Sequence, residues 1–273
     1  RDMSYLSRES SPVSAELWQE IDAAVVETAR KALTGRRFLH IFGPLGIGVE
    51  SISVDRTGEV EEVESEGFLS TNGRKYVEIP SVYNDFTLLA RDLENSARLG
   101  FPTDLTEAVR AASICARLED TFLYFGNPGL GYEGLMTAPG IQKIKRSDWK
   151  SGENAFADIA AGLEHFASSG IFGTYALSLS PDLYLDLQRI QPGTGLLEID
   201  RVRKMLDGKV YQSTALGKEK AVLVCSEPAN MDLVVGQDLS VAYLEQKDLN
   251  HRFRVLETIL PRIKNNNAVV AFE

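Results

Sequence analysis

The chain has 273 residues, of which 44% are hydrophobic and 25% are charged, and its formal net charge at pH 7 is -10. This balance is typical of a globular protein with a core of its own. The negative charge argues against non-specific nucleic-acid binding, which depends on the neutralisation of phosphates.

Two further features of the composition exclude a membrane protein and a disulfide scaffold. No run of about 18 apolar residues is present, so no membrane-spanning helix is expected, and residues Arg1–Ser4 carry no apolar signal core. The two cysteines, Cys115 and Cys225, form no CxxC pair and are expected to be reduced, as in a cytoplasmic protein.

The first predicted element is an amphipathic helix over residues 14–33, with Ser14 as its N-cap and Gly35 as its stop. Apolar residues recur at helical spacing on one face, and charged residues occupy the other. The predicted apolar face consists of Leu17, Ile21, Ala24, Val25, Thr28, Ala32 and Leu33. A helix of this kind must lie on another surface of the protein or of a partner.

A strand is predicted over residues 37–42, followed by a long hairpin over residues 49–83. Two short alternating runs, 49–54 and 76–79, are separated by a turn-rich tract that is acidic from Glu59 to Glu66. The hairpin has too few apolar residues to form a core. It therefore requires a partner surface, which another subunit could supply.

The rest of the chain mixes helices and strands without regular βαβ alternation, which predicts an α+β fold. Helices are expected over 104–125, 154–168 and 198–206, with another beginning at Ser180-Pro181. Strands are expected over 175–179, 221–226, 231–235, 240–245, 251–263 and 268–272, and loops over 126–140 and 191–195. The buried side of the 104–125 helix is predicted to hold Leu105, Val109, Ala112, Ala116, Leu118 and Phe122, and that of the 154–168 helix Phe156, Ile159, Ala160, Leu163 and Phe166.

Glycine-rich and histidine motifs give no sign of a cofactor or metal site. Gly129, Gly131 and Gly134 match GxGxxG, but a helix precedes them where a dinucleotide site requires a strand. The three histidines, His40, His165 and His251, are far apart in the chain and lack the spacing of a zinc site.

Catalytic motifs are also missing from the sequence. There is no GxSxG nucleophile motif. Glu119 and Asp120 are adjacent on a predicted helix, so they point to different faces and are expected to cap or bridge rather than to catalyse. The amphipathic first helix and the hairpin instead indicate a protein that assembles and is not an enzyme.

Segments along nearly the whole chain resemble the encapsulin shell proteins. In chain order they are Leu17–Asp22, Leu33–Phe38, Gly43–Gly46, Tyr83–Phe86, Arg91–Glu94, Leu118–Asp120, Phe125-Gly126, Gly134–Met136, Gly173–Leu177, Leu179–Tyr184, Leu233–Leu239 and Asn250–Val255. Tyr83–Phe86 and Arg91–Glu94 look like the strand and turn that follow the family's extended loop. The detail is similar to the branch that encloses iron-mineralising, ferritin-like cargo.

This resemblance implies the tailed-phage major capsid protein fold. Its peripheral domain would comprise residues 1–48, 84–140 and 226–273, its extended loop residues 49–83, and its axial domain residues 141–225. The resemblance also implies a homo-oligomeric icosahedral shell of sixty copies or a multiple of sixty. Such a compartment would lie in the cytoplasm and would bind neither a membrane nor a specific nucleic acid.

The resemblance further implies that the shell encloses a cargo protein, ferritin-like or a peroxidase, through its C-terminal targeting peptide. The compartment would serve iron storage or protection from oxidative stress, with small ions admitted through pores. The peptide groove is expected near Val25, Leu33, Arg36, Phe38, Leu233 and Val235, and the five-fold pore loop is expected at Gln191, Pro192, Gly193, Thr194 and Gly195.

Two departures from relatives concern the ligands of the shell. His40 stands where some relatives have an acidic residue, so the polarity of the peptide is expected to differ. Some relatives bind flavin against a tryptophan beside the segment Phe86–Asp92, which contains none here. No flavin, other cofactor or metal is therefore expected in the chain, and iron would be handled by the cargo.

Two alternative functions follow from the same residues. A tailed-phage major capsid protein that encloses DNA would share the fold, but the net charge of -10 and the amphipathic N-terminal helix argue against it. A bacteriocin or a protease-type enzyme would need a nucleophile–base pair or a metal motif, and the sequence has neither.

Overall fold

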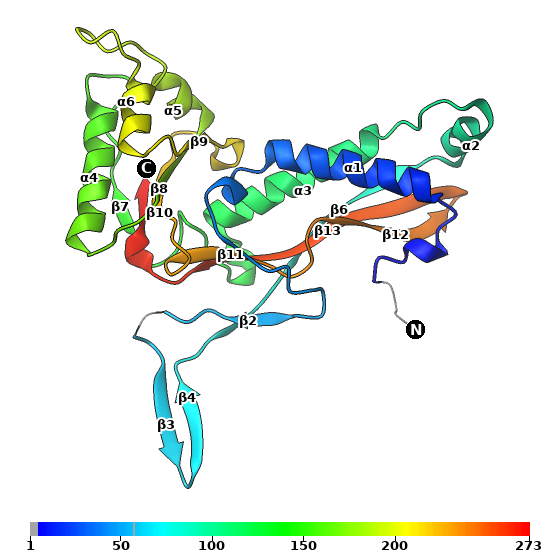
Figure 1. Ribbon diagram of the computed structural model, residues 1–273, viewed down its shortest axis with the longest axis horizontal. Coiled ribbons are helices and arrows are strands. Elements are labelled where there is room, and N and C mark those ends of the chain that lie inside the picture. The colour runs from blue at the N-terminus through cyan, green and yellow to red at the C-terminus, as the bar shows by residue number, and fades with distance from the viewer. Residues whose placement is uncertain (1–4, 57) are drawn as a thin grey trace.

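The computed structural model describes residues 5–56 and 58–273, and it confirms a mixture of helices and sheets. Residues Arg1–Ser4 lie outside the described residues, and so does the prediction that they carry no signal core. Figure 1 shows a long body, a more compact unit at one end, and an arm that projects from the body between them. No helix in the described ranges is long and apolar enough to cross a membrane.

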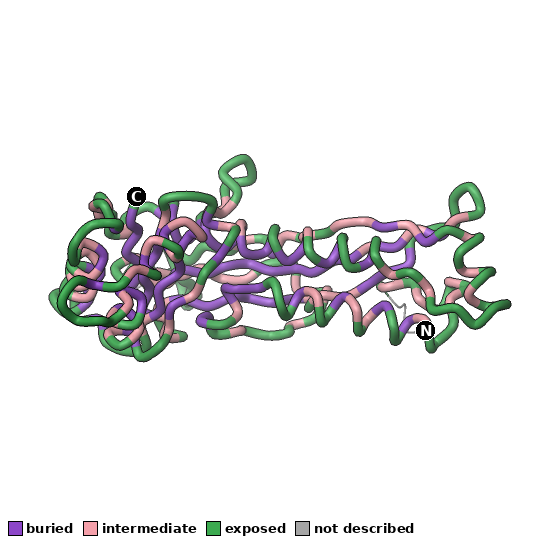
Figure 2. Tube along the Cα trace, turned by 90° about the horizontal axis from the view of Figure 1, so that it is seen from above, coloured by how far each residue is buried: buried purple, intermediate pink, exposed green. Residues whose placement is uncertain are grey.

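The long body consists of two helices on one sheet. The sheet has the order β1 (Ile41–Phe42), β11 (Met231–Val235), β13 (Asn250–Ile263) and β12 (Ser240–Lys247), and β6 (Ser81–Leu88) pairs with β13. Helices α1 (Ala15–Ala32) and α3 (Thr106–Phe125) lie side by side over it (Figure 1). Buried residues run along the whole length of this body (Figure 2).

Helix α1 confirms the first predicted helix. The Ser14 side chain accepts a hydrogen bond from the Leu17 amide at 3.1 Å, as an N-cap should. Its buried stripe is narrower than predicted and consists of Trp18, Ile21, Val25 and Ala29. The predicted Ala24, Thr28 and Leu17 are only partly covered, and Ala32 is exposed. Trp18, Ile21 and Val25 pack against the sheet and α3, where the Trp18 ring meets Phe253 edge to face at 5.5 Å, and Ala29 packs against Ala116 of α3.

The buried face of α3 differs from the prediction. Val109 and Leu118 are 38% and 44% exposed, whereas the small residues Ala108, Ala111, Ala112, Cys115 and Ala116 are buried. This helix packs against α1 on one side and against β6 and β13 on the other. Close approach to two neighbours favours small side chains in the first three turns, whereas the last turn buries the large Phe122, Leu123 and Tyr124; of the predicted residues, Ala112, Ala116 and Phe122 are buried.

The compact unit is a second five-stranded sheet with helices beside it. Its order is β7 (Gln142–Ile144), β14 (Val269–Phe272), β10 (Ala221–Cys225), β8 (Tyr175–Leu179) and β9 (Val210–Gln212). Helices α4 (Asn154–Ser168), α5 (Pro181–Asp186) and α6 (Glu198–Met205) accompany it. In α4 the buried residues are Ala155, Ile159, Gly162 and Phe166. Of the predicted buried side, Phe156, Ala160 and Leu163 are only partly covered. Strands β7 and β9 were not predicted.

The last strand, β14, shows that the end of the chain belongs to the compact unit. It pairs antiparallel with β10, as Ala221 opposite Phe272, and parallel with β7. The compact unit therefore includes β14 besides strands from residues 141–225, whereas the resemblance placed residues 226–273 with the peripheral domain. Strand order in a sheet is a long-range property, which a local pattern does not record.

The arm confirms the predicted protruding hairpin. Strand β2 (Ser51–Ser53) pairs with β5 (Tyr76–Glu78), and β3 (Glu61–Ser65) pairs with β4 (Phe68–Asn72). Every residue of β3 and β4 is exposed in the single chain. The arm ends at Pro80, since β6 begins at Ser81 and joins the body sheet beside β13.

Shorter elements complete the chain. The 3-10 turns are η1 (Arg8–Ser10), η2 (Gly35–Arg37), η3 (Pro128–Leu130), η4 (Thr214–Leu216) and η5 (Asn266–Ala268). A helix, α2 (Ala90–Leu99), covers the segment that was expected to form a turn. The strand predicted over 37–42 is reduced to β1, because η2 turns the chain first. Ser180 precedes α5 with Pro181 at its first turn, but its hydroxyl accepts from the Lys220 amide instead of capping the helix.

A candidate groove beside the first helix

A groove of about 560 Å³ runs beside α1 on its exposed side. Three segments that are distant in sequence meet there: α1, η2 and the connection from β11 to β12. Its lining residues are Val26, Ala29, Arg30, Leu33, Arg36, Arg37, Asp238 and Leu239. The groove therefore combines an apolar base with charged edges.

The apolar base has a small core of its own. Ala29 and Leu33 are buried together with Ala116 of α3, and Leu239 packs against them. Val26, one turn before Arg30 on the same side of α1, is 43% exposed and is available to a ligand. Helical spacing places Val26, Arg30 and Leu33 on one face, which differs from the face that covers the sheet.

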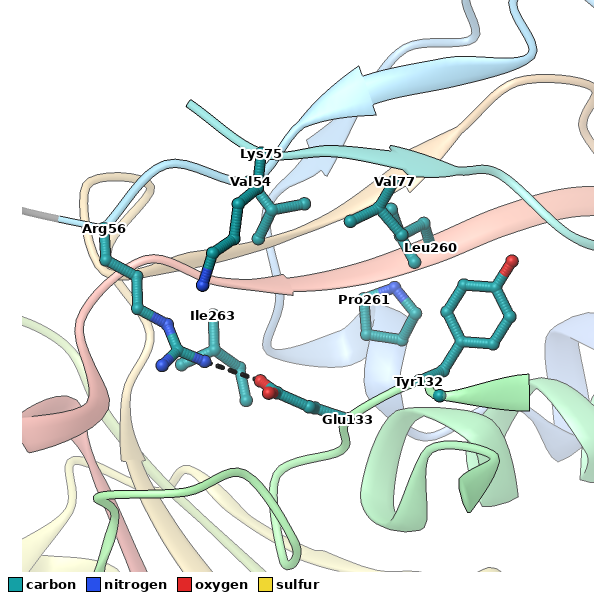
Figure 3. Close-up of a pocket in the computed structure, with 10 residues that line it drawn as sticks. Val54, Arg56, Lys75, Val77, Tyr132, Glu133, Leu260, Pro261 and Ile263 are labelled. Atoms are coloured by element: carbon teal, nitrogen blue, oxygen red, sulfur yellow. Dashed lines mark hydrogen bonds and ion pairs between the residues drawn. The ribbon is translucent and has the colours of Figure 1, made fainter. Parts of the chain in front are cut away.

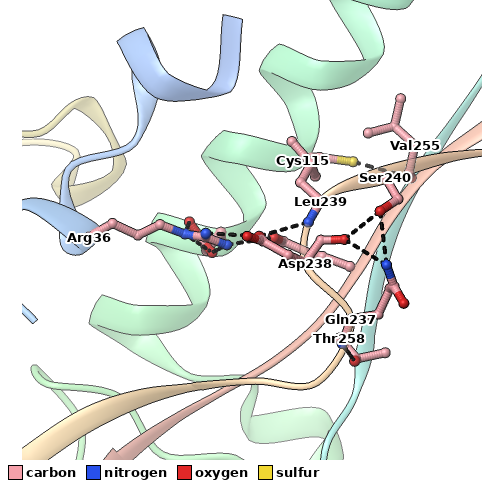
Figure 4. A network of polar contacts seen from close by, with 10 residues as sticks. Arg36, Cys115, Gln237, Asp238, Leu239, Ser240, Val255 and Thr258 are labelled. Atoms are coloured by element: carbon pink, nitrogen blue, oxygen red, sulfur yellow. Dashed lines mark hydrogen bonds and ion pairs between the residues drawn. The ribbon is translucent and has the colours of Figure 1, made fainter. Parts of the chain in front are cut away.

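Arg36 forms the polar end of the groove and is held by three carboxylates (Figure 4). Its Nη2 donates to Glu119 Oε1 at 2.7 Å and to Glu257 Oε2 at 3.1 Å, and its Nη1 donates to Asp238 Oδ1 at 2.9 Å. Glu119 and Glu257 have side chains that are each 2% exposed, whereas the Asp238 side chain is 53% exposed. The Arg36 guanidinium thus links the two buried carboxylates of Glu119 and Glu257 to the exposed carboxylate of Asp238 at the groove surface.

One guanidinium does not balance two buried acids. Burial raises the pKa of Glu257 well above its ordinary value, and repulsion from Glu119 raises it further. Burial also raises the pKa of Glu119, although Arg36 opposes this effect. The pair therefore binds a proton more readily than two separate carboxyl groups would.

Asp120, the neighbour of Glu119, fixes the turn that presents Arg36. Its two carboxylate oxygens accept hydrogen bonds from the amides of Thr34 at 2.9 Å and Gly35 at 3.0 Å. Gly35 also lies so close to α3 that a Cβ there would meet Leu123 Cδ2 at 2.2 Å. The prediction that Glu119 and Asp120 bridge and cap is confirmed, and the same contacts explain why η2 replaces the expected strand.

The structure brings together only two of the six residues expected in the groove. Leu33 and Arg36 line it, whereas Val25, Leu233 and Val235 are each 1% exposed and belong to the core. Phe38 is also buried and stacks on Tyr211 at 5.8 Å. Those four side chains are buried in this structure and do not line this groove.

The residues that replace them were within reach of sequence reasoning. Val26, Ala29, Arg30 and Arg37 lie in or beside the segments Leu17–Asp22 and Leu33–Phe38, and Asp238 and Leu239 end the segment Leu233–Leu239. The helical period also separates Val26 and Arg30 from the buried stripe. The missing information was which face of α1 the sheet covers.

The predicted pore loop lies at the far end of the compact unit, between α5 and α6 (Figure 1). Gln191 is buried, and its side-chain amide bridges Glu198 and Arg201. Pro192 to Gly195 are exposed. Gly193 and Gly195 have φ values of 84° and 68°, a left-handed backbone that glycine adopts readily. The loop is therefore anchored at Gln191, and its exposed tip is held only within the loop, where the Thr194 hydroxyl donates to the Gln191 carbonyl at 3.2 Å.

The other motifs take structural roles. Gly126 and Gly134 lie backbone to backbone, where a Cβ on Gly134 would meet the Gly126 amide nitrogen at 2.3 Å. The His251 ring nitrogen Nδ1 is 3.0 Å from the Tyr243 hydroxyl. Burial raises the pKa of the Cys115 thiol to about 12. Among the described residues, no group of three or more His, Cys, Asp or Glu side chains is arranged to hold a metal ion.

Comparison with known proteins matches this chain to one family over most of its length. Residues 3–260 match the family described as "Encapsulating protein for peroxidase". The type 1 encapsulin shell protein of Myxococcus xanthus is 40% identical over 98% of this chain and 96% of its own length. A diheme-cytochrome-encapsulin shell fusion protein of Kuenenia stuttgartiensis is 38% identical, over 96% of this chain and 74% of its own. A ferritin-like-encapsulin shell fusion protein of Pyrococcus furiosus is 24% identical, over 95% and 69%.

Solved structures extend the similarity to phage capsids. The virus-like particle from Pyrococcus furiosus superposes with a TM-score of 0.77 at 23% identity, over 95% of this chain and all of that one. The capsid of the Myoviridae phage XM1 superposes with a TM-score of 0.65 at 15% identity, over 88% and 91%. These matches confirm the tailed-phage capsid fold.

Proposed function

The chain belongs to the encapsulin shell-protein family, and from this membership we propose that its shell holds a cargo protein whose targeting peptide docks in the groove beside α1. The protein is a structural subunit of an icosahedral nanocompartment. The similarity to phage capsids is one of fold alone, so enclosure of DNA gains no support from it. Protection of nucleic acid in nuclease-treated particles would contradict this proposal.

The observation that carries the cargo proposal is the groove itself. Its base of Val26, Ala29, Leu33 and Leu239 can bury two or three apolar side chains of an extended peptide. Its charged edges can orient the peptide through hydrogen bonds. It remains open in the single chain, since no segment among the described residues fills it.

Val26→Asp is expected to reduce the cargo content of purified shells at least about tenfold, because it places a charge against the apolar side chains of the peptide. The measurement is the ratio of cargo to shell subunit after co-expression with a native cargo protein. Val109→Asp is the matched control, as Val109 is similarly exposed at 38% but lies on α3, outside this groove.

Both variants should assemble with wild-type yield, since both side chains face solvent in the single chain. Equal loading by wild type and Val26→Asp would place the peptide elsewhere. Loss of loading only in Val109→Asp would move the site to the neighbouring surface between α1 and α3.

We propose a ferritin-like protein or a peroxidase as the cargo, and iron storage or oxidative protection as the role of the compartment. The family description names peroxidase, and one relative is itself a ferritin-like fusion. Small ions would enter through the loop 191–195, whose exposed tip and buried base suit a flexible pore lining. A stained native gel of the purified shell, tested for iron and for haem peroxidase activity, distinguishes the two cargo classes.

Pro192→Trp is expected to slow the entry of ferrous iron several-fold without affecting assembly, because it enlarges an exposed loop tip that makes no core contact. The measurement is the rate of iron oxidation by enclosed ferritin-like cargo. Lys218→Trp, in an exposed turn of the same unit, serves as the control. An unchanged rate in Pro192→Trp would show that iron enters by another path.

We further propose that the chain itself catalyses no reaction, binds no flavin and resides with its shell in the cytoplasm. In support, the cavity beside Leu88, Leu89 and Asp92 is only about 100 Å³ and is lined by the acids Asp92, Asp104 and Glu107. That size and charge do not suit a flavin nucleotide, which has a bulky ring system and a negatively charged phosphate on its ribityl chain. A flavin absorbance band in pure, cargo-free shells would contradict the proposal.

A further inference from the structure

The arm is joined to the body by few contacts. Strands β2 and β5 form a two-stranded sheet of their own, so no ladder of the body sheet holds the paired part of the arm. The chain leaves and rejoins the body near Glu50 and Pro80, where the Ile79 amide donates to the Glu50 carbonyl and the Ile259 amide donates to the Pro80 carbonyl. Beyond these points, side chains must set the angle of the arm.

Three polar side-chain contacts act beside the apolar packing of Ile52, Val54 and Val77 on the core. The Tyr132 hydroxyl donates to the Glu78 carbonyl at 3.0 Å, and Arg262 Nη1 donates to the Ser53 carbonyl at 3.1 Å. Farther out on the arm, Arg56 Nη2 donates to Glu133 Oε2 at 2.6 Å, the only one of the three that joins two opposite charges.

A cavity of about 220 Å³ lies between the base of the arm and the body. Val54 and Val77 of the arm face Leu260, Pro261 and Ile263 of β13 across it (Figure 3). Figure 3 also shows Arg56 reaching over the edge of the cavity to Glu133, with Lys75 beside it. The base of the arm packs on the core through Ile52, Val54, Val77 and the buried Ile79, but beside these contacts the cavity leaves room for the outer part of the arm to close or to lift.

The polar contact that lies farthest out on the arm, between Arg56 and Glu133, is expected to restrict the angle of the arm most. A contact far from the point of attachment restricts a rotation more than an equal contact close to it. Lys75 and Arg56 both line the cavity, and Glu133 is the body residue that pairs with Arg56 there. The side chains of Arg56 and Glu133 are 23% and 44% exposed, so the ion pair is weak and the arm can change its angle. Because the shell is symmetric, the same pair is present in every subunit.

We propose that the Arg56–Glu133 ion pair sets the angle between arm and body, and through it the size of the shell that this chain closes. The inference rests on the function proposed above, that of a subunit in an icosahedral shell, and it takes the arm to lie on a neighbouring subunit. A small change of angle is repeated at every symmetry-related contact. A shell closes only when the angles between successive subunits add up to a closed surface, so the ion pair selects among shells of different curvature.

The test compares size distributions of purified shells by mass photometry and negative-stain imaging. Arg56→Ala and Glu133→Ala are each expected to change the ratio of other sizes to the wild-type size at least about threefold. The exchanged pair, Arg56→Glu with Glu133→Arg, is expected to return the ratio toward wild type. Arg74→Ala is the matched control, because Arg74 pairs with Asp55 at 3.1 Å within the arm and does not touch the body.

The salt dependence of the wild-type size distribution gives a second measurement. At 1 M NaCl the screening length is about 3 Å, so wild-type shells assembled there should shift in the same direction as Arg56→Ala. The size distribution of Arg56→Ala itself should change less with salt.

Wild-type size distributions in both single variants would overturn the inference. So would single variants that fail to assemble and are not restored by the exchange, since a general structural need would then explain them. If wild-type protein itself forms no closed particles, the proposed function fails first, and the two failures are distinguishable.

Discussion

Arg36→Leu is expected to destabilise the subunit by about 3–5 kcal/mol, the usual cost of removing one partner of a buried ion pair. The substitution leaves Glu119 and Glu257 buried with no cation against them. It also frees Asp238 from the groove edge. The measurement is the midpoint of unfolding by guanidinium chloride, followed by tryptophan fluorescence. Both tryptophans, Trp18 and Trp149, are buried and will report the loss of structure.

Two controls separate lost charge compensation from lost packing. Arg98→Leu removes an exposed pair with Glu94 on α2 and is expected to leave the midpoint unchanged within error. The double variant Arg36→Leu/Glu257→Gln should recover part of the stability, because it removes one of the two uncompensated acids. A single variant as stable as wild type would show that water, rather than Arg36, satisfies the buried carboxylates.

Glu257→Gln is expected to raise the unfolding midpoint at neutral and alkaline pH. The pKa of this carboxyl is raised in the folded state, so the folded form binds its proton more tightly than the unfolded form. The stability that this proton contributes is fully present below the unfolded pKa of about 4.3. It is lost as pH rises toward the folded pKa, and glutamine, which has no proton to lose, removes that dependence.

The measurement is the unfolding midpoint of wild type and Glu257→Gln across pH 4 to 9, with Glu20→Gln on the exposed side of α1 as the control. The gap between Glu257→Gln and wild type should widen as pH increases, and Glu20→Gln should run parallel to wild type. A glutamine variant less stable than wild type at high pH would mean that Glu257 is ionised and fully paired with Arg36.

Both predictions concern the same link between shell stability and cargo binding. Asp238 is at once a partner of Arg36 and a lining residue of the groove. A change at the buried acids therefore reaches the surface on which we expect the targeting peptide to dock. Arg36→Leu shells should accordingly lose cargo as well as stability.

Local patterns predicted most elements of this protein closely. The predicted bounds of the 154–168 helix and of the 175–179 and 231–235 strands are those observed, and the long hairpin and the Ser14 cap are also confirmed. These features depend on residues that are neighbours in the chain: a cap and its helix, a turn and its strands, a period of two or of 3.6. The errors, such as the strand expected over 37–42, arise where a distant group intervenes, here Asp120.

By itself the sequence predicted the α+β class, the protruding hairpin and the family, and two of the residues that the resemblance named for the peptide site, Leu33 and Arg36, line the observed groove. Only the tertiary structure decided the rest of the groove, because periodicity shows which residues share a helix face but not which face another element will cover. The same holds for the cluster around Arg36. Its carboxylates lie 83, 202 and 221 positions away along the chain, and only the path of the folded chain brings them within hydrogen-bond distance.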